Sequence, residues 1–276
     1  MLVFPDCKIN LGLRILNKRA DGYHNIETVF YPVPLKDALE VIQSGNREAM
    51  QFSSSGLVIK GDCTDNLCIK AYQLLKKDFP HIPSLKIHLH KTIPMGAGLG
   101  GGSADAAFTL QLLNDQFHLN LSTHQLINYA LRLGSDCPFF ILHHACLGTG
   151  RGEILQKISL NLSAYQVMLI NPGIHVNTSD AFAALQLQHV NYPIASLAEI
   201  ISEPVEDWQH SLKNDFEIPV FNKYPAIKEI KQTLYQNGAA YSAMSGSGST
   251  VFGLFSKTFR PAINFDSRYF VRLLSL

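Results

Sequence analysis

The stretch PMGAGLGGGSADAA, residues 94–107, has the composition of a site that binds a ligand through the main chain. Five glycines fall between Gly96 and Gly102, and a helical pattern follows at once. Glycine lets the backbone approach a ligand closely, and the first turn of a helix offers unpaired N–H groups and a positive dipole end. One tight turn needs only one or two glycines. The stretch therefore predicts an anion site, with phosphate as the natural occupant.

Three known phosphate motifs can be compared with this loop. A P-loop needs a lysine before its Ser or Thr, but Gly102 stands there, before Ser103. The dinucleotide pattern G-x-G-x-x-G fits Gly96, Gly98 and Gly101, yet the strand with an acidic end that should follow is absent from the sequence. A protein-kinase loop would need H-R-D and D-F-G further on, and the sequence has neither. A nicotinamide-dependent oxidoreductase and a nucleotide-binding module without turnover remain alternatives at this point.

The loop needs a strand before it and a helix after it. Alternating apolar residues predict a strand over SLKIHLHK, with His88 and His90 on its wet face, and a helix follows from about 103 to 117, with Ser103 as a candidate N-cap or hydroxyl donor. Further strands are predicted over residues 8–16, 25–31, 38–43 and 164–171, and on both sides of the turn 245–249. Further helices are predicted over 64–77, capped by Thr64 or Asp65, over 122–134, closed by Gly134, and over 224–237 before Gly238.

Length and composition indicate the broad class of protein and its domain organisation. The 276 residues approach the limit of about 250–300 at which a single core stops growing, so we expect two lobes, residues 1–157 and 158–276. Hydrophobic residues make up 46% and the formal net charge is +1, which is typical of a globular protein and a poor match to nucleic-acid binding. No membrane segment, secretion signal or zinc cluster is expected. The five cysteines form no C-x-x-C pair and predict free thiols in a reducing cytoplasm.

Five stretches together resemble the galactokinase, homoserine kinase, mevalonate kinase and phosphomevalonate kinase superfamily, the GHMP kinases. Beside the glycine loop they are KINLGLRILNKRADGYHNIETVF (8–30), LGSDCPFF (133–140), NDFE (214–217) and MSGSGSTVFGLF (244–255). The resemblance implies an α+β, two-lobe GHMP kinase fold. Its N-terminal lobe would be like domain 2 of ribosomal protein S5 and its C-terminal lobe a ferredoxin-like α/β sandwich, with the active site in the cleft between them.

RADGYH is the element typical of one branch, the kinases of a methylerythritol that carries a cytidine diphosphate group. The resemblance implies that ATP, with Mg²⁺, phosphorylates the 2-hydroxyl of this small molecule in non-mevalonate isoprenoid synthesis. Another kinase of the superfamily, acting on homoserine or mevalonate, is the alternative. The expected state is a monomer or weak homodimer.

The resemblance places the catalytic pair at Lys8 and Asp136. Asp136 would accept the proton of the substrate hydroxyl, and Lys8 would keep Asp136 ionised and neutralise charge on the transferred group. The residues implied to hold the ATP phosphates are Pro94, Met95, Gly96, Ala97, Gly98, Leu99, Gly100, Gly101, Gly102, Ser103 and Ala104. No protein metal ligands are implied. Cys7 and Cys137 flank the pair, and we expect at least one of their thiols near the site.

The resemblance also assigns the substrate contacts. Tyr23 and Phe182 would cover the two faces of the cytosine ring, while His24 would hydrogen-bond the base edge. Asn10 and Thr178 match polar positions near the erythritol and diphosphate portions. MSGSGS is expected to close over the substrate, and NDFE is expected to have a structural role only.

Overall fold

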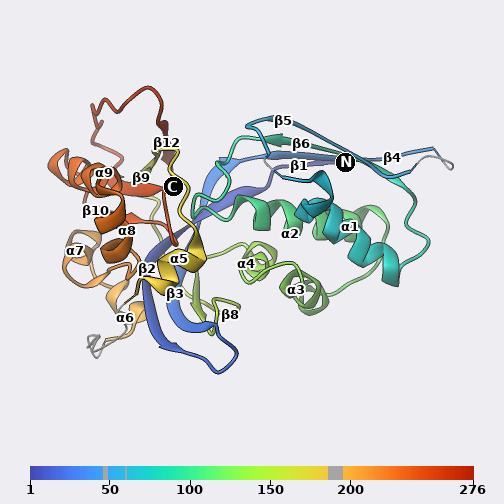
Figure 1. Cartoon of the computed structure of the whole chain (residues 1–276), viewed down its shortest axis with the longest axis horizontal. Coiled ribbons are helices and arrows are strands. Elements are labelled where there is room, and N and C mark those ends of the chain that lie inside the picture. The colour runs from blue at the N-terminus through green and yellow to red at the C-terminus, as the bar shows by residue number, and fades with distance from the viewer. Residues whose placement is uncertain (46–48, 60, 186–194) are drawn as a thin grey trace. The chain divides into compact units, whose positions relative to one another are not determined.

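The computed structural model describes residues 1–45, 49–59, 61–185 and 195–276. The chain forms two compact units, which are treated separately below (Figure 1). The first comprises Met1–Cys7, Leu35–Met95 and Gly100–His144, and the second comprises Lys8–Pro34, Gly96–Leu99 and Ala145–Leu276. The chain passes between the units several times, and the boundary at residue 157 stays a prediction about sequence domains.

The first unit contains a four-stranded sheet in the order β1-β4-β6-β5. β4 (Ala38–Gln43) pairs antiparallel with β1 (Leu2–Val3) and β6 (Leu85–Lys91), whereas β5 (Gln51–Gly56) runs parallel to β6. Leu85, Ile87 and Leu89 of β6 are buried, as their alternation predicts. This strand leads directly into the glycine loop.

Helices of the first unit lie on one side of that sheet (Figure 1). They are α1 (Leu67–Asp78), α2 (Gly101–Gln116), α3 (Thr123–Leu131) and α4 (Cys137–Leu142), preceded by a short 3-10 turn at Cys63–Asp65. Two predicted helix ends are wrong. The turn takes Thr64 and Asp65 out of the cap position, so Asn66 caps α1 by accepting from the N–H of Cys68, and α3 ends at Leu131, before Gly134.

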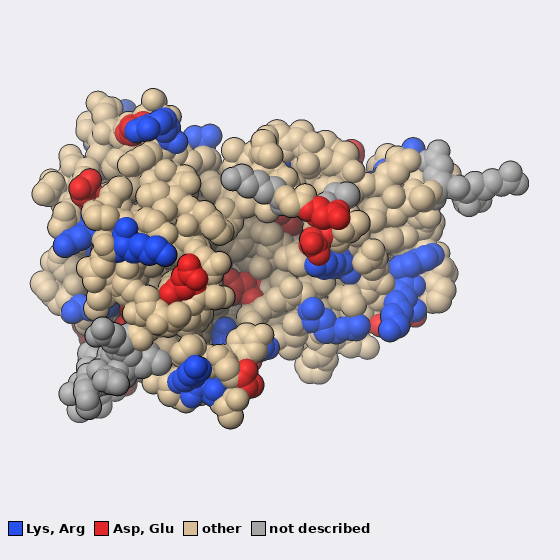
Figure 2. Space-filling view, viewed as in Figure 1, with Lys and Arg blue, Asp and Glu red and all other residues tan. Residues whose placement is uncertain are grey.

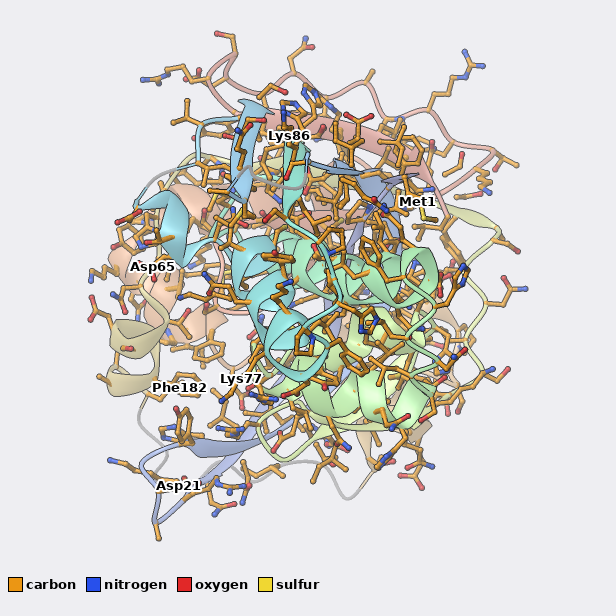
Figure 3. All side chains as sticks on the ribbon, turned by 90° about the vertical axis from the view of Figure 1, so that its right-hand side faces the viewer. Met1, Asp21, Asp65, Lys77, Lys86 and Phe182 are labelled. Carbon is orange, nitrogen blue, oxygen red and sulfur yellow. The ribbon has the colours of Figure 1, made fainter. Side chains whose placement is uncertain are left out.

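The second unit contains two sheets. The first has the order β2-β3-β7-β8, built from β2 (Asp6–Lys18), β3 (His24–Lys36), β7 (Cys146–Thr149) and β8 (Ile154–Lys157). The strands predicted over 8–16 and 25–31 are confirmed, and both are longer than predicted. They join in a hairpin whose turn is closed by Arg19 N donating to Tyr23 O at 2.8 Å. Asp21 lies in the turn of this hairpin (Figure 3).

The second sheet of this unit is fully antiparallel in the order β10-β11-β9-β12. Its strands are β9 (Tyr165–Asn171), β10 (Tyr241–Met244), β11 (Val251–Ser256) and β12 (Phe270–Ser275). Met168 and Phe255 share a core with Ile230 and Leu234 of α9 (Pro225–Gln236). The remaining elements are α5 (Thr178–Ala183), α6 (Leu197–Ile200), the 3-10 turn Val205–Asp207, α7 (Trp208–Ser211) and α8 (Glu217–Lys223). As predicted, Gly238 follows α9, with φ +86°.

Within the described ranges, no helix is both long and apolar enough to cross a membrane. On the face shown in Figure 2, separate groups of Lys and Arg are interspersed with Asp and Glu. This distribution agrees with the formal net charge of +1.

Candidate active site

Helix α2 begins inside the glycine loop. Gly100 is its N-cap residue with φ +69°, and the helix starts at Gly101. Ser103 therefore lies within the first turn, and its prediction as the N-cap is wrong. Its hydroxyl hydrogen-bonds the Cys137 thiol instead. Gly96 has φ +61°, a conformation that favours glycine.

Two successive carbonyl groups of the loop accept hydrogen bonds from the protein. Gly98 O accepts from Lys8 Nζ at 3.0 Å and from Ser245 Oγ at 2.8 Å, and Leu99 O accepts from Lys8 N at 3.0 Å. In a trans peptide the C=O and the next N–H point in opposite directions. The N–H groups of Leu99 and Gly100 therefore point away from these partners, which is the orientation that an anion site needs.

The loop glycines differ in how much space their surroundings leave for a side chain. A Cβ on Gly98 would lie 1.9 Å from Ser245 O, and the residue has φ +79°. A Cβ on Gly101 would lie 2.9 Å from Ile93 Cγ2, whereas one on Gly102 would meet nothing closer than 3.9 Å. Close packing of the loop against Ser245 therefore forbids a side chain at Gly98 most strongly.

Lys8 and Asn10 form one buried polar group. Lys8 is 3% exposed, and its Nζ donates to Asn10 Oδ1 at 2.6 Å and lies 5.3 Å from the centre of the Phe30 ring. Asn10 Nδ2 donates to Thr28 Oγ1 at 2.9 Å. The amide of Asn10, predicted to contact substrate, is thus engaged with Lys8 and Thr28.

Asp136 belongs to the first unit, and Lys8 to the second, so their pairing stays a prediction. Asp136 is the N-cap residue of α4, but its side chain makes no capping hydrogen bond and is partly buried. Helix capping therefore does not explain why an aspartate stands at this position. Cys7 and Cys137 are fully buried, and burial raises the pKa of the Cys137 thiol to about 12.

The predicted base-binding residues lie in the second unit. His24 stacks on Phe182, with ring centres 4.6 Å apart and an interplanar angle of 10°. Tyr23 is 55% exposed, and the Arg151 guanidinium lies 4.8 Å from its ring centre. Sequence reasoning placed Tyr23 opposite Phe182 and His24 at the base edge. In the structure the stacking partner of Phe182 is His24, and Arg151 is a neighbour that the sequence did not suggest.

The surroundings of His24 set its charge. Burial, and then the charge of Lys18, lower the pKa of His24, which favours the neutral form of the imidazole. A neutral ring both donates and accepts a hydrogen bond, as contact with a base edge requires. Thr178 Oγ1 lies 2.8 Å from Ser247 Oγ of the turn after β10. Thr178 and the MSGSGS stretch therefore meet in the second unit.

A buried charged triad at the base of the loop was not predicted. Lys91 Nζ bonds Asp37 and lies 2.6 Å from Asp105 Oδ2, and the side-chain exposure of the three is between 0% and 4%. Asp37 Oδ1 also accepts from Thr92 N at 2.5 Å and Ile93 N at 2.9 Å. The triad thus holds the chain on both sides of the loop, where β6 ends and α2 begins.

No group of three or more His, Cys, Asp or Glu side chains is placed to hold a metal ion among the described residues. The chain's donors at the loop are instead main-chain N–H groups, which bind anions and not cations.

A strand, a glycine loop and a helix start are the features expected of a phosphate-binding site. Family comparisons are consistent with this expectation. Residues 66–144 match the family model "GHMP kinases N terminal domain", and residues 195–263 match "GHMP kinases C terminal". The chain belongs to the GHMP kinase family, and the predicted α+β GHMP kinase fold is confirmed. This match favours the kinase interpretation of the loop over the dinucleotide interpretation.

Within this family, the chain is similar in sequence to kinases of one particular name. The chain is 52% identical over 257 residues to the 4-diphosphocytidyl-2-C-methyl-D-erythritol kinase of Bacteroides fragilis, an alignment that covers 93% of this chain and 92% of the relative. It is 46% identical over 256 residues to the enzyme of that name from Porphyromonas gingivalis, covering 92% of both chains.

Solved structures agree with these relatives. A crystal structure of a 4-(cytidine 5'-diphospho)-2C-methyl-D-erythritol kinase matches with TM-score 0.76 and 31% identity, covering 92% of this chain and 90% of that one. A mevalonate kinase matches with TM-score 0.69 at 12% identity, covering 94% and 92%. The second match shows the fold alone.

Proposed function

We propose that this protein transfers the γ-phosphoryl group of ATP to the 2-hydroxyl of 4-diphosphocytidyl-2-C-methyl-D-erythritol, in non-mevalonate isoprenoid synthesis. The observation that carries this proposal is 52% identity to an enzyme of that name over 93% of the chain. The glycine loop supports this proposal independently. Gly98 O accepts hydrogen bonds from Lys8 and Ser245, so the next main-chain N–H points the other way and can donate to a phosphate. A homoserine or mevalonate kinase is not favoured, since those solved structures are only 15% and 12% identical.

Phosphoryl transfer requires positioning and charge stabilisation, with a group that takes the acceptor proton. The main chain from Pro94 to Ala104 holds the triphosphate. Lys8 neutralises charge that develops on the transferred group, and Asp136 accepts the proton of the substrate hydroxyl. Mg²⁺ would enter as part of the Mg-ATP co-substrate and would neutralise negative charge on its phosphates.

The cytidine group is recognised on the second unit. Tyr23, His24 and Phe182 supply aromatic surface and a neutral imidazole for the base, and Asn10 and Thr178 are assigned to the polar remainder of the substrate. Because His24 stacks on Phe182 at 4.6 Å, a base that uses this face of Phe182 must take the place of His24. We also assign the enzyme to the cytoplasm, with a monomeric or weakly dimeric state to be measured by sedimentation.

Phosphorus NMR tests the activity directly. The protein is incubated with Mg-ATP and the cytidine-diphosphate alcohol, and we expect ADP and one new phosphomonoester signal. Parallel samples with homoserine, mevalonate or galactose should show none at the same protein concentration. A phosphomonoester formed only from one of these alcohols, or no ADP from any, would overturn the proposed substrate.

Asp136→Asn tests the assigned base. The amide keeps the shape of the carboxylate but cannot accept the hydroxyl proton, so turnover should fall at least about a hundredfold. The affinity for ATP, measured by calorimetry, should stay within about twofold of the parent, because ATP is held elsewhere. Asp115→Asn, on the same unit at the end of α2, is the control and should keep parental turnover. Near-parental turnover in Asp136→Asn would reject Asp136 as the base.

A further inference from the structure

The NDFE stretch is tied to the turn between β10 and β11. Asn214 is 2% exposed, and its Nδ2 donates to Met244 O at 2.7 Å and to Gly246 O at 2.8 Å. Its Oδ1 accepts from Phe216 N at 3.0 Å, so the amide orientation is fixed. The two carbonyls that Asn214 binds lie on either side of Ser245.

Ser245 in turn contacts two acceptors of the Lys8 ammonium. Its side chain is fully buried, and Oγ donates to Gly98 O at 2.8 Å and accepts from Asn10 N at 3.2 Å. Oγ also lies 3.4 Å from Asn10 Oδ1. Lys8 Nζ donates to these same two atoms, Gly98 O at 3.0 Å and Asn10 Oδ1 at 2.6 Å.

We propose that Asn214 is a positioning residue for Lys8: by holding the main chain on both sides of Ser245, it lets the Ser245 hydroxyl fix the two acceptors that orient the Lys8 ammonium. The proposal rests on the role of Lys8 in the proposed function.

Both the Lys8 side chain and the turn that carries Ser245 are flexible, so each needs contacts that hold it in place. A lysine ammonium is a point charge on a flexible four-carbon stem, so its acceptors decide where it lies. The turn that carries Ser245 includes Gly246 at φ +57° and Gly248 at φ +94°, residues with wide backbone freedom. Asn214 donates to the carbonyls of Met244 and Gly246, while Glu217 Oε1 accepts from Met244 N at 2.9 Å and Thr250 O accepts from Ser245 N at 2.9 Å. A displacement of about 1 Å in a catalytic group can cost about a hundredfold in rate.

Asn214→Asp is the first test. The carboxylate keeps the acceptor for Phe216 N, loses both donors, and sets a negative oxygen against two carbonyls. We expect kcat to fall roughly tenfold to a hundredfold. Tyr235→Phe is the matched control, because it also removes a hydrogen bond to β10, from Tyr235 Oη to Ser242 O at 3.1 Å, but does not touch the turn. Its kcat should remain parental.

The same substitution in a Lys8→Met protein distinguishes a role in positioning Lys8 from a general loss of structure. In the Lys8→Met protein the residue to be positioned is gone, so adding Asn214→Asp should change the remaining turnover less than about twofold. A merely structural effect would lower turnover by the same factor in both backgrounds. Equal factors would therefore overturn the proposal.

A crystal structure of Asn214→Asp gives a readout that does not depend on the substrate. We expect Ser245 Oγ to leave hydrogen-bond distance of Gly98 O and the Lys8 ammonium to shift. Unchanged distances from Lys8 Nζ to Gly98 O and Asn10 Oδ1 would overturn the positioning role. If the parent protein phosphorylates no cytidine-bearing alcohol, the proposed function fails, while this comparison still decides the role of Asn214.

Discussion

Gly98 lies in the glycine loop and Gly102 in the first turn of α2, and of these two residues only Gly98 leaves no room for a methyl group. We expect Gly98→Ala to reduce turnover about a hundredfold through displacement of the loop. Because its φ is +79°, the variant should also lose about 1–3 kcal/mol of unfolding free energy. The displacement of the loop follows from the 1.9 Å distance between the new Cβ and Ser245 O. Steady-state kinetics and urea unfolding measure the two effects.

Gly102→Ala is the matched control. Its Cβ would meet Leu67 Cδ1 at 3.9 Å, an ordinary contact, and its φ is not in the left-handed region. We expect turnover within about threefold of the parent, since placing Ala inside a helix is itself favourable. Equal losses at Gly98 and Gly102 would show that the contact with Ser245 is not what matters.

At the residue scale, the sequence predicted the glycine loop because five glycines lie within seven positions, from Gly96 to Gly102. It did not predict the roles of Ser245 and Asn214. Their contacts join segments far apart in the chain, 147 residues in the case of Ser245 and Gly98, and no spacing pattern encodes such a pair. Arg151 was missed for the same reason, because its contact with Tyr23 arises only when the two strand turns meet.

At the element scale, the triad of Asp37, Lys91 and Asp105 joins the end of β6 to α2. Lys91→Met removes the cation and leaves two carboxylates buried together. We expect a loss of about 3–5 kcal/mol in unfolding free energy, because an uncompensated buried charge is costly. Urea unfolding of the parent and the variant measures the difference.

The control for this prediction is an exposed ion pair on the same unit. Lys70→Met removes the bond to Asp65 at 2.9 Å, where the two side chains are 42% and 77% exposed. Such pairs contribute less than about 1 kcal/mol. A loss in Lys91→Met as small as that in Lys70→Met would mean that the triad adds little to the fold around the loop.

Elements with strong periodicity were predicted well, and others were not. β6 and β9 have apolar patterns, and both are confirmed near their predicted ends. β5, QFSSSG, was not predicted because serines dominate it, and it is a strand through its parallel pairing with β6. β3 continues to Lys36 through two prolines that conceal its pattern. The N-cap of α1 was predicted wrongly because Thr64, Asp65 and Asn66 compete for it within three positions.

At the scale of the whole molecule, one histidine should make stability depend on pH. His143 Nε2 lies 2.8 Å from Asp6 Oδ2, and this hydrogen bond raises the pKa of His143 above 6.5. Phe108 packs at its ring edge, and burial, followed by the charge of Lys36, opposes the increase of this pKa. Since the folded protein holds this proton more tightly than the unfolded chain, its stabilisation is fully present below pH 6.5 and is lost as pH rises through the folded pKa.

The measurement is Tm between mildly acidic and mildly alkaline pH, for the parent and for His143→Asn. Asparagine tolerates the left-handed conformation at this position, φ +54°, so the backbone is preserved. We expect the decrease of Tm with rising pH to be smaller in the variant. His124→Asn, at an exposed position in the first turn of α3, is the control and should follow the parent. The same slope in all three proteins would contradict the assignment to His143.

The packing of the Ser245 carbonyl beside Gly98 also has a consequence for biosynthesis. While the chain is emerging from a ribosome, residues 94–104 are made long before the turn that completes their surroundings. Truncated chains that stop before β10 would lack the Ser245 hydroxyl and the Thr250 amide that hold this bend, so they should not capture nucleotide. We therefore expect ATP to bind only chains whose synthesis has continued past Thr250.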